Sequence, residues 1–343
     1  MTWNAGLLWQ FDILILLMMV ICAVTALTLG GLLSSAIVTG VYSFLTCLIW
    51  THMMAVDVAF TEAAVGAAIS TVIFLGSAQY IDRWIKADRP KEQGIKQITL
   101  VVTVICAVMM LTAAGDLPDW ADPASPASTH VSPGYIEQGY HETATPNVVT
   151  AVLADYRSYD TMFESVVVFA AALVVMLVLR RTAHEYRSVL LLRPKREGRD
   201  TVLRGAAQSI IPVMQIFALY VLCHGHYSPG GGFQGGVIFG ASFILLALCY
   251  NLKFSMNRFR EHAVLWCCAG GVLLYAGVGA VCLAMGFNFL GYAGLAGLLG
   301  VSDVMARSHG ILAVEIGVGI TVMSVMVSLY NDLASGGDLE DGL

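Results

Sequence analysis

The chain of 343 residues is 57% hydrophobic and only 12% charged, its mean hydropathy is +0.75, and its formal net charge is −6. Soluble domains contain about 25% charged residues, and binding to nucleic acid requires clustered Lys and Arg on a folded face. The composition therefore excludes a cytosolic enzyme, a nucleic-acid-binding protein and a disordered regulator, and it favours an all-α, polytopic membrane protein.

Apolar segments long enough to cross a membrane recur along the chain. A helix needs about 20 mostly apolar residues to span about 30 Å of hydrocarbon. Such segments lie at residues 11–30, 33–53, 57–81, 97–114, 161–179, 207–224, 233–252, 263–286 and 309–331. The sequence therefore predicts about nine transmembrane helices.

Basic residues lie on alternate connections between these segments. Of the 18 Lys and Arg, 16 follow the third, fifth and seventh segments, and only Arg157 and Arg307 do not. Because cytoplasmic loops are enriched in Lys and Arg, this pattern predicts an N-terminus outside the cell, a C-terminus in the cytoplasm and an external segment 115–157. The tail after Asp332 is expected to be flexible.

Several ionisable side chains lie inside the apolar segments. They are Asp57 and Glu62 in the third, Glu164 in the fifth, and Glu315 with His309 in the ninth. A charge near the bilayer centre costs at least about 2.5–3.5 kcal/mol, so these residues are candidates for an ion or proton pathway. The predicted orientation places all five within the first two turns from the external face. For each residue alone, the alternative is a side chain that reaches the interface or is satisfied between helices.

Asp160 and Glu164 are four residues apart and share one face of the fifth helix. Two carboxylates at this spacing repel each other unless a proton or a cation lies between them. The pair is therefore a candidate for exchanging a proton for a metal cation. The alternative is that Asp160 only caps the helix, because Asp is a common residue at helix N-termini.

A glycine-rich run separates the sixth and seventh segments, from His224 to Gly236. Glycines and a proline cannot continue a helix, and irregular backbone within a membrane survives only where protein or water surrounds it. The run therefore predicts a packed re-entrant turn built from His224, His226, Pro229, Gly230, Gly231 and Gly232. A metal site at the two histidines is the alternative, but the sequence has no third ligand at a recognisable spacing.

Three stretches carry a resemblance to a known family. The stretch DVAFTEAAVGAAISTVIFL (57–75) resembles the hydrogenase D-subunit-like module, which is related to the J-type subunit of the complex I membrane arm. LADYRSYDTMFESVVVFAA (153–171) resembles the adjoining E-type module, and LYVLCHGHYSPGGGFQGGVIFGASFILLAL (219–248) resembles the B subunit of Mrp-type multisubunit Na⁺/H⁺ antiporters. The expected modules are a three-helix module at 1–82, a two-helix module with the external segment at 83–206, and a four-helix module at 207–343.

The resemblance implies a non-enzymatic, multi-pass subunit of a Na⁺/H⁺ antiporter in a bacterial plasma membrane. Its implied partners are the large A- and D-type and the small C-, E-, F- and G-type subunits, together with membrane lipid. The family's acidic positions for the cation correspond to Glu62, and to Glu164 with Asp160 beside it. Glu315 replaces an Asp that is frequent in B-type subunits, and no cofactor is implied.

Two other functions remain open from the residues. The same modules serve in the ion-translocating arm of a redox-driven hydrogenase-like complex, and a purely structural scaffold between larger pumps is a further alternative. In the common Mrp arrangement the first two modules end the large A subunit, so their fusion with a B-type module suggests a shortened A subunit. The sequence does not determine the cation, the stoichiometry or the direction of transport.

Overall fold

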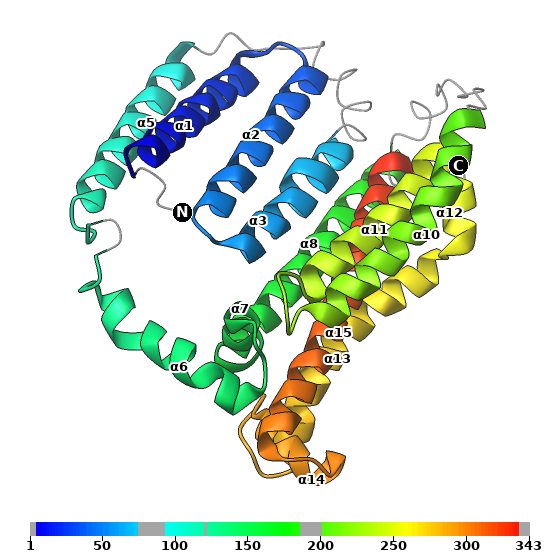
Figure 1. Cartoon of the computed structure of the whole chain (residues 1–343). Helices are drawn as coiled ribbons and strands as arrows, with labels where there is room; N and C mark the ends of the chain where they lie inside the picture. The colour runs from blue at the N-terminus through cyan, green and yellow to red at the C-terminus, as the bar shows by residue number, and fades with distance from the viewer. Residues whose placement is uncertain (1–4, 75–92, 120–121, 186–200, 336–343) are drawn as a thin grey trace. The chain divides into compact units, whose positions relative to one another are not determined.

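The computed structural model describes residues 5–74, 93–119, 122–185 and 201–335, and their regular structure is entirely helical. The helices in chain order are α1 (Ala5–Thr28), α2 (Leu32–His52), α3 (Val56–Glu62), η1 (Ala63–Ser70), α5 (Gln93–Ala114), η2 (Ala127–Val131), α6 (Ser132–Thr143), α7 (Val148–Ala151), η3 (Val152–Tyr156), α8 (Ser158–Glu185), α10 (Thr201–His224), α11 (Gly232–Cys249), α12 (Leu252–Arg258), α13 (Glu261–Ala284), η4 (Tyr292–Leu295), α14 (Ala296–Leu299) and α15 (Asp303–Ser335) (Figure 1).

The chain divides into two compact units. The first comprises residues 1–80 and 139–343, and the second comprises residues 81–138. The second unit contains α5, whose large apolar side chains are exposed, η2 and the start of α6. The division between units falls within α6, and the predicted module boundary at residue 82 lies outside the described residues.

Nine helical stretches of the described residues are long and apolar enough to cross a membrane, which confirms the predicted number. They cover Gln10–Thr28, Leu32–His52, Val56–Phe74, Gln97–Ala114, Ser158–Arg180, Thr201–His224, Gly232–Cys249, Glu261–Ala284 and Asp303–Ser335. The end of the predicted third segment, at residue 81, lies outside the described residues. The orientation of the helices in the membrane stays a prediction.

Several helix ends differ from the predicted segments by up to six residues, and two of them show a local reason. The seventh helix ends at Cys249 rather than 252, because Asn251 accepts a hydrogen bond from the Phe254 N–H at 2.7 Å and begins the separate helix α12. The ninth helix begins at Asp303 rather than 309 and continues past Asp332 to Ser335. Its first turns are polar, so hydropathy does not reveal them. Residues 336–343 of the expected flexible tail lie outside the described residues.

Helix α15 is the centre of the first unit and packs against α8, α11 and α13 (Figure 1). Close approach depends on glycines that leave no room for a Cβ atom: Gly236 faces the Gly319 backbone, and Gly271 faces the Gly317 carbonyl and Thr321. Small residues allow helices in a membrane to pack closely in this way. At Gly270 and Gly277, no described atom lies within 4 Å of a Cβ built there.

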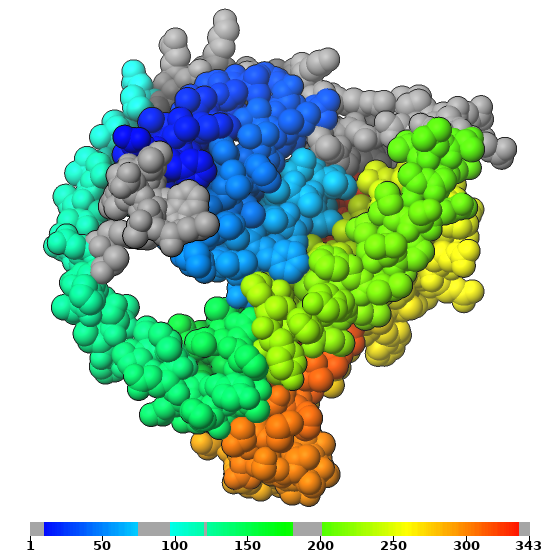
Figure 2. All heavy atoms as spheres, viewed as in Figure 1, coloured from blue at the N-terminus to red at the C-terminus, as the bar shows by residue number. Residues whose placement is uncertain are grey.

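The outer surface of the first unit carries large apolar side chains. Helix α10 lies on this surface in Figure 2, where Val213 and Ile216 are 65% and 70% exposed. Apolar surface of this extent is expected where a helix faces lipid or another membrane protein.

Helices α1 and α2 form an antiparallel hairpin that leads to α3. Asp12 Oδ1 lies 2.6 Å from His52 Nδ1, so an acid–imidazole contact joins the start of α1 to the end of α2. Helix α3 then continues directly as the π-helix η1, which begins immediately after Glu62. Single π-helical turns are rare and frequently lie at functional sites.

Candidate functional site

The glycine-rich run forms a tight turn between α10 and α11. Gly230 has φ of 146° and Gly231 has φ of 132°, a region that L side chains rarely adopt. A Cβ at Gly231 would lie 2.7 Å from Glu315 Oε1, and a Cβ at Gly232 would collide with the backbone oxygen of Glu315. The glycines thus provide both the turn conformation and close contact with α15.

Asp57 lies in the first turn of α3 and holds this glycine-rich turn. Its Oδ1 accepts hydrogen bonds from the Gly230 N–H at 3.2 Å and from Asn147 Nδ2 at 3.3 Å. Asn147 Nδ2 also donates to the carbonyl oxygens of Gly225 and Ser228 at 3.3 and 3.1 Å. One amide therefore connects Asp57 to both halves of the turn.

Asn147 also begins α7, because its Oδ1 accepts from the Val149 and Thr150 N–H groups. The orientation of the Asn147 amide agrees with all these contacts. Its Nδ2 faces carbonyl oxygens, which accept, and its Oδ1 faces backbone N–H groups, which donate. The sequence interpretation missed Asn147. Its only local signal is an N-cap residue type after a proline, and all its long-range partners come from other helices.

Glu315 lies under the turn and is only 8% exposed. One side of its carboxylate, Oε1, faces Gly231. The other oxygen, Oε2, is buried and has no hydrogen-bond partner among the described residues; it lies 3.6 Å from His226 Nδ1. Because α15 begins earlier than predicted, Glu315 lies roughly three turns from its start.

The two histidines of the turn have different surroundings. His226 is 7% exposed, and its Nε2 lies 3.1 Å from the Ser308 carbonyl oxygen. Burial lowers the pKa of the His226 imidazole, and the hydrogen bond to Ser308 opposes this effect. His224 instead stacks on Tyr220, with ring centroids 4.8 Å apart, and contacts Tyr227. Pro229 is exposed.

Glu62 is the last residue of α3, and its Oε1 accepts a hydrogen bond from Ser43 Oγ of α2 at 2.6 Å. One residue earlier, Thr61 Oγ1 accepts from Gln234 Nε2 of α11 at 2.7 Å. These contacts connect α3 to α2 through Glu62, and to α11, the helix that follows the glycine-rich turn, through Thr61.

The remaining predicted residues do not join this cluster by any hydrogen bond or ion pair of the described residues. Asp160 pairs with Arg157 at 2.6 Å, in the first turn of α8, and not with Glu164. The helix begins at Ser158, so Asp160 is not its N-cap residue. Glu164 and His309 are exposed. A cation shared by Asp160 and Glu164 therefore stays a prediction.

A charged cluster at Arg307 was also missed. Arg307 Nε lies 2.6 Å from Asp155 Oδ2, its Nη1 lies 3.1 Å from Glu142 Oε2, and Tyr156 donates to the same Glu142 oxygen at 2.7 Å. The hydrogen bond from Tyr156, followed by that from Arg307, lowers the pKa of Glu142. Burial raises the pKa of Asp155 and, with the hydrogen bond to Glu142, raises that of Tyr156 to about 12. The signal in the sequence was Arg307 itself. It is one of the two basic residues that lie on connections predicted to be external.

At the other end of α15, Arg180 of α8 binds two carboxylates. Its Nη1 lies 2.6 Å from Glu261 Oε1 and its Nε lies 3.0 Å from Asp332 Oδ1. The Asp332 side chain is only 1% exposed, so it belongs to the packed unit.

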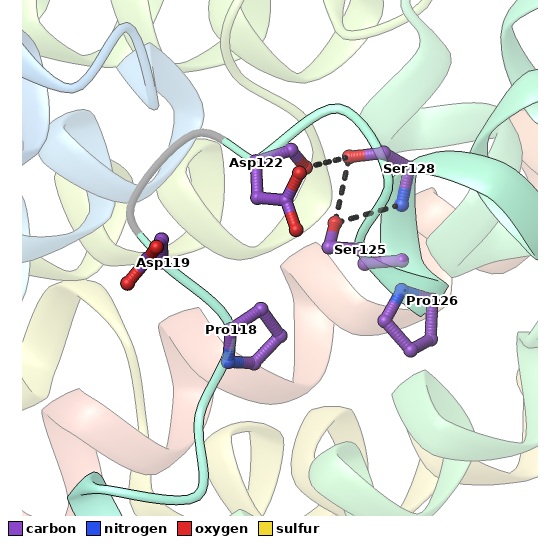
Figure 3. A pocket seen from close by; sticks show the side chains of 7 residues that line it. Pro118, Asp119, Asp122, Ser125, Pro126 and Ser128 are labelled. Carbon is purple, nitrogen blue, oxygen red and sulfur yellow. Dashed lines mark hydrogen bonds between the residues drawn. The ribbon is translucent and has the colours of Figure 1, made fainter.

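No metal cluster accompanies these residues in the part of the chain that the structure describes. Within the described ranges, no group of three or more His, Cys, Asp or Glu side chains could hold a metal ion. An open pocket of the second unit is lined by Pro118, Asp119, Asp122, Ser125, Pro126, Ala127 and Ser128 (Figure 3). It contains none of the predicted site residues.

Comparisons with known families divide the chain into three parts. Residues 17–83 match the MbhD family, described as the D subunit of MBH, and residues 96–196 match the MbhE family, described as the E subunit of MBH. Residues 202–328 match a domain related to the MnhB subunit of Na⁺/H⁺ antiporter. The three ranges follow the order of the predicted modules.

Individual relatives agree with these families. An antiporter subunit of Staphylococcus aureus, mnhB2, is 31% identical over 134 residues, which are 36% of this chain and 92% of that protein. A Rhizobium meliloti protein named as the A/B subunit of a K(+)/H(+) antiporter is 25% identical over 281 residues, which are 75% of this chain and 28% of that protein. The chain thus spans about a quarter of the Rhizobium relative.

A solved structure has the same fold. A chain of the Mrp complex from Dietzia sp. superposes with a TM-score of 0.72 at 21% identity, covering 96% of this chain and 35% of that chain. At this identity the likeness concerns the fold alone.

Proposed function

Since the chain belongs to the family of Mrp-type multisubunit cation/proton antiporter subunits, we propose that it contributes an acidic site to the path of the cation and the proton. The observation that carries this proposal is the convergence of Asp57 and Glu315, from α3 and α15, on one glycine-rich turn. Buried carboxylates in membrane proteins are costly and are typical of ion and proton pathways.

The cation is proposed to bind at Glu62. Its carboxylate lies against the Ser43 hydroxyl, and hard cations such as Na⁺ and K⁺ prefer oxygen ligands. Asp57 is on the same helix and faces the turn, so α3 connects the proposed cation position to Glu315. Glu164, with Asp160 and His309 near the same membrane face, is proposed as a part of the pathway outside this cluster.

The remaining assignments extend the proposal. The site faces the outside of a bacterial plasma membrane, with the C-terminus in the cytoplasm. The partners are the large A- and D-type and the small C-, E-, F- and G-type antiporter subunits, as well as lipid. The modules at 1–82, 83–206 and 207–343 act together as one subunit, and the isolated chain is expected not to exchange ions.

The matches to the D and E subunits of MBH support a second candidate, the membrane arm of a redox-driven complex. Purification of the native complex distinguishes the two functions. Nickel–iron or iron–sulfur proteins in the purified complex favour the redox-driven arm, and their absence together with cation-dependent exchange favours the antiporter.

Exchange in everted vesicles that contain the whole complex tests the acidic site. Glu62→Gln keeps the shape but removes the charge, so we expect loss of Na⁺/H⁺ or K⁺/H⁺ exchange at normal complex abundance. Glu62→Asp keeps the charge and should retain partial activity with weaker apparent cation affinity. Glu137→Gln, at an exposed carboxylate of α6, is the matched control. Full exchange by Glu62→Gln, Asp57→Asn and Glu164→Gln would leave the structural scaffold as the better explanation.

A further inference from the structure

His226 and Glu315 face each other beneath the glycine-rich turn. His226 Nδ1 and Glu315 Oε2 are 3.6 Å apart, and the two side chains are only 9% and 10% exposed. Glu315 Oε2 has no hydrogen-bond partner among the described residues. An unpaired buried oxygen is unfavourable, and the His226 ring lies where a displacement of a few tenths of an ångström would bring Nδ1 within hydrogen-bond distance of it.

The Ser308 carbonyl determines which nitrogen of His226 carries the proton. His226 Nε2 lies 3.1 Å from this carbonyl oxygen. A carbonyl oxygen only accepts hydrogen bonds, so Nε2 must be the donor. In the neutral ring, Nδ1 is then a bare acceptor that faces Glu315 Oε2. Two acceptors repel each other, so this contact is favourable only when a proton lies between Nδ1 and Oε2.

The other groups that face the pair do not replace that proton. Asp57 of α3 and Tyr275 of α13 lie within electrostatic reach of Glu315, and His309 lies within reach of His226. None of them is Lys or Arg. If Glu315 and Asp57 were both deprotonated, two carboxylate charges would lie near one turn, with none of the groups named here carrying a basic side chain between them.

We propose that Glu315 and His226 bind one proton as a pair, between Oε2 and Nδ1, and that this pair is the proton site of the exchange. On release, the O–H bond of Glu315 breaks and Nδ1 accepts the proton and passes it to water, which leaves a carboxylate and a neutral ring. Ser308 is a positioning group that fixes the tautomer. The inference rests on the proposed antiporter function, and it separates the proton site from Glu62, where the cation is proposed to bind.

The test is a double-mutant cycle in the intact complex, read as the pH dependence of exchange in everted vesicles. His226→Gln retains an N–H donor near the position of Nε2, so it can keep the bond to Ser308 while removing the acceptor that faces Glu315. Glu315→Gln keeps the shape of the carboxyl group. We expect each variant to assemble normally and to shift the pH profile by about one unit or more, or to lower the rate at least about tenfold. The double variant should be no worse than the more damaged single variant.

His262→Gln and Asp303→Asn, at exposed positions of α13 and α15, are the matched controls. If His226→Gln leaves the pH profile unchanged, or if the two effects add independently, the pair is wrong. Loss of exchange in Glu62→Gln alongside an unchanged His226→Gln profile would keep the proposed function and discard only the pair. If His226→Gln does not assemble, infrared difference spectroscopy of the wild-type complex decides. A protonated-carboxyl band that is absent in Glu315→Gln and titrates together with an imidazole band supports the pair, and separate titration overturns it.

Discussion

Arg307 Nε and Asp155 Oδ2 are 2.6 Å apart, and this ion pair joins α15 to the segment η3 that precedes α8. The Asp155 side chain is only 9% exposed. Removing one partner of a buried pair leaves the other charge uncompensated, which typically costs about 3–5 kcal/mol.

We therefore expect Arg307→Gln to lower the abundance and thermal stability of the complex. Because the cost arises from the unpaired carboxylate, adding Asp155→Asn should restore much of the loss. Thermal unfolding of the purified complex, followed by fluorescence, measures both effects. A double variant no more stable than Arg307→Gln alone would contradict this explanation.

The Tyr156–Glu142 hydrogen bond should persist in alkaline solution. The pKa of Tyr156 is raised to about 12, so the phenol keeps its proton and its contribution to stability below pH 10 and loses it as the pH rises through about 12. Ultraviolet titration of the wild type minus Tyr156→Phe measures this pKa. Glu142→Gln should lower it only in part, since burial is the larger cause. A Tyr156 pKa near 10 in the wild type would contradict the prediction.

Gly231→Ala should abolish exchange through Glu315. Its φ of 132° strains any side chain by about 1–3 kcal/mol, and the new Cβ would also displace Glu315 Oε1. Gly286→Ala is the matched control, because Gly286 has φ of 84° but no described atom within 4 Å of an added Cβ. Exchange rate per complex in vesicles should therefore fall for Gly231→Ala and not for Gly286→Ala. If the exchange rate falls equally in both variants, backbone strain alone explains the loss, and contact with Glu315 does not.

Ser43→Ala should weaken apparent cation affinity and leave complex abundance unchanged. The Ser43 hydroxyl donates to the Glu62 carboxylate at 2.6 Å, and a hydrogen bond to a charged group contributes about 1.5–3 kcal/mol. We expect the apparent KM for the cation to rise about tenfold or more, with a smaller change in maximal rate. Ser34→Ala, at an exposed position of the same helix, is the control. An unchanged KM would exclude Ser43 from the cation site.

The membrane orientation can be tested by fusion reporters. Because basic residues concentrate on alternate connections, a reporter placed after Lys195 should be cytoplasmic and one placed near Pro126 should be external. The opposite result at either position would remove the orientation on which an externally accessible site depends.

The sequence predicts the number of helices well, because a membrane imposes a minimum apolar length that few other structures imitate. It also predicts the packed turn, since Gly230 and Gly231 need a backbone conformation that other residues rarely adopt. Helix ends were less predictable. The polar start of α15 and the cap at Asn251 depend on hydrogen bonds that hydropathy does not report.

The site was only partly predictable for a different reason. Asp57 and Glu315 are visible as carboxylates in apolar segments, but their common turn depends on how α3 and α15 pack. Asn147 and Gln234 cannot be recognised from their sequence neighbours, because their hydrogen-bond partners Asp57 and Thr61 lie far away in the chain. Asp160 and Glu164 share a helix face in the sequence, yet Arg157 is the nearer partner of Asp160.

Helix α15 is held by a guanidinium group at each end, by Arg307 to Asp155 and Glu142 at one and by Arg180 to Asp332 at the other. A rod fixed at both ends cannot slide along its axis or swing without breaking an ion pair. Glu315 lies between these two ion-pair clusters, so the protonation change proposed for it and His226 would take place within a helix that is held to α8 at one end and to η3 at the other.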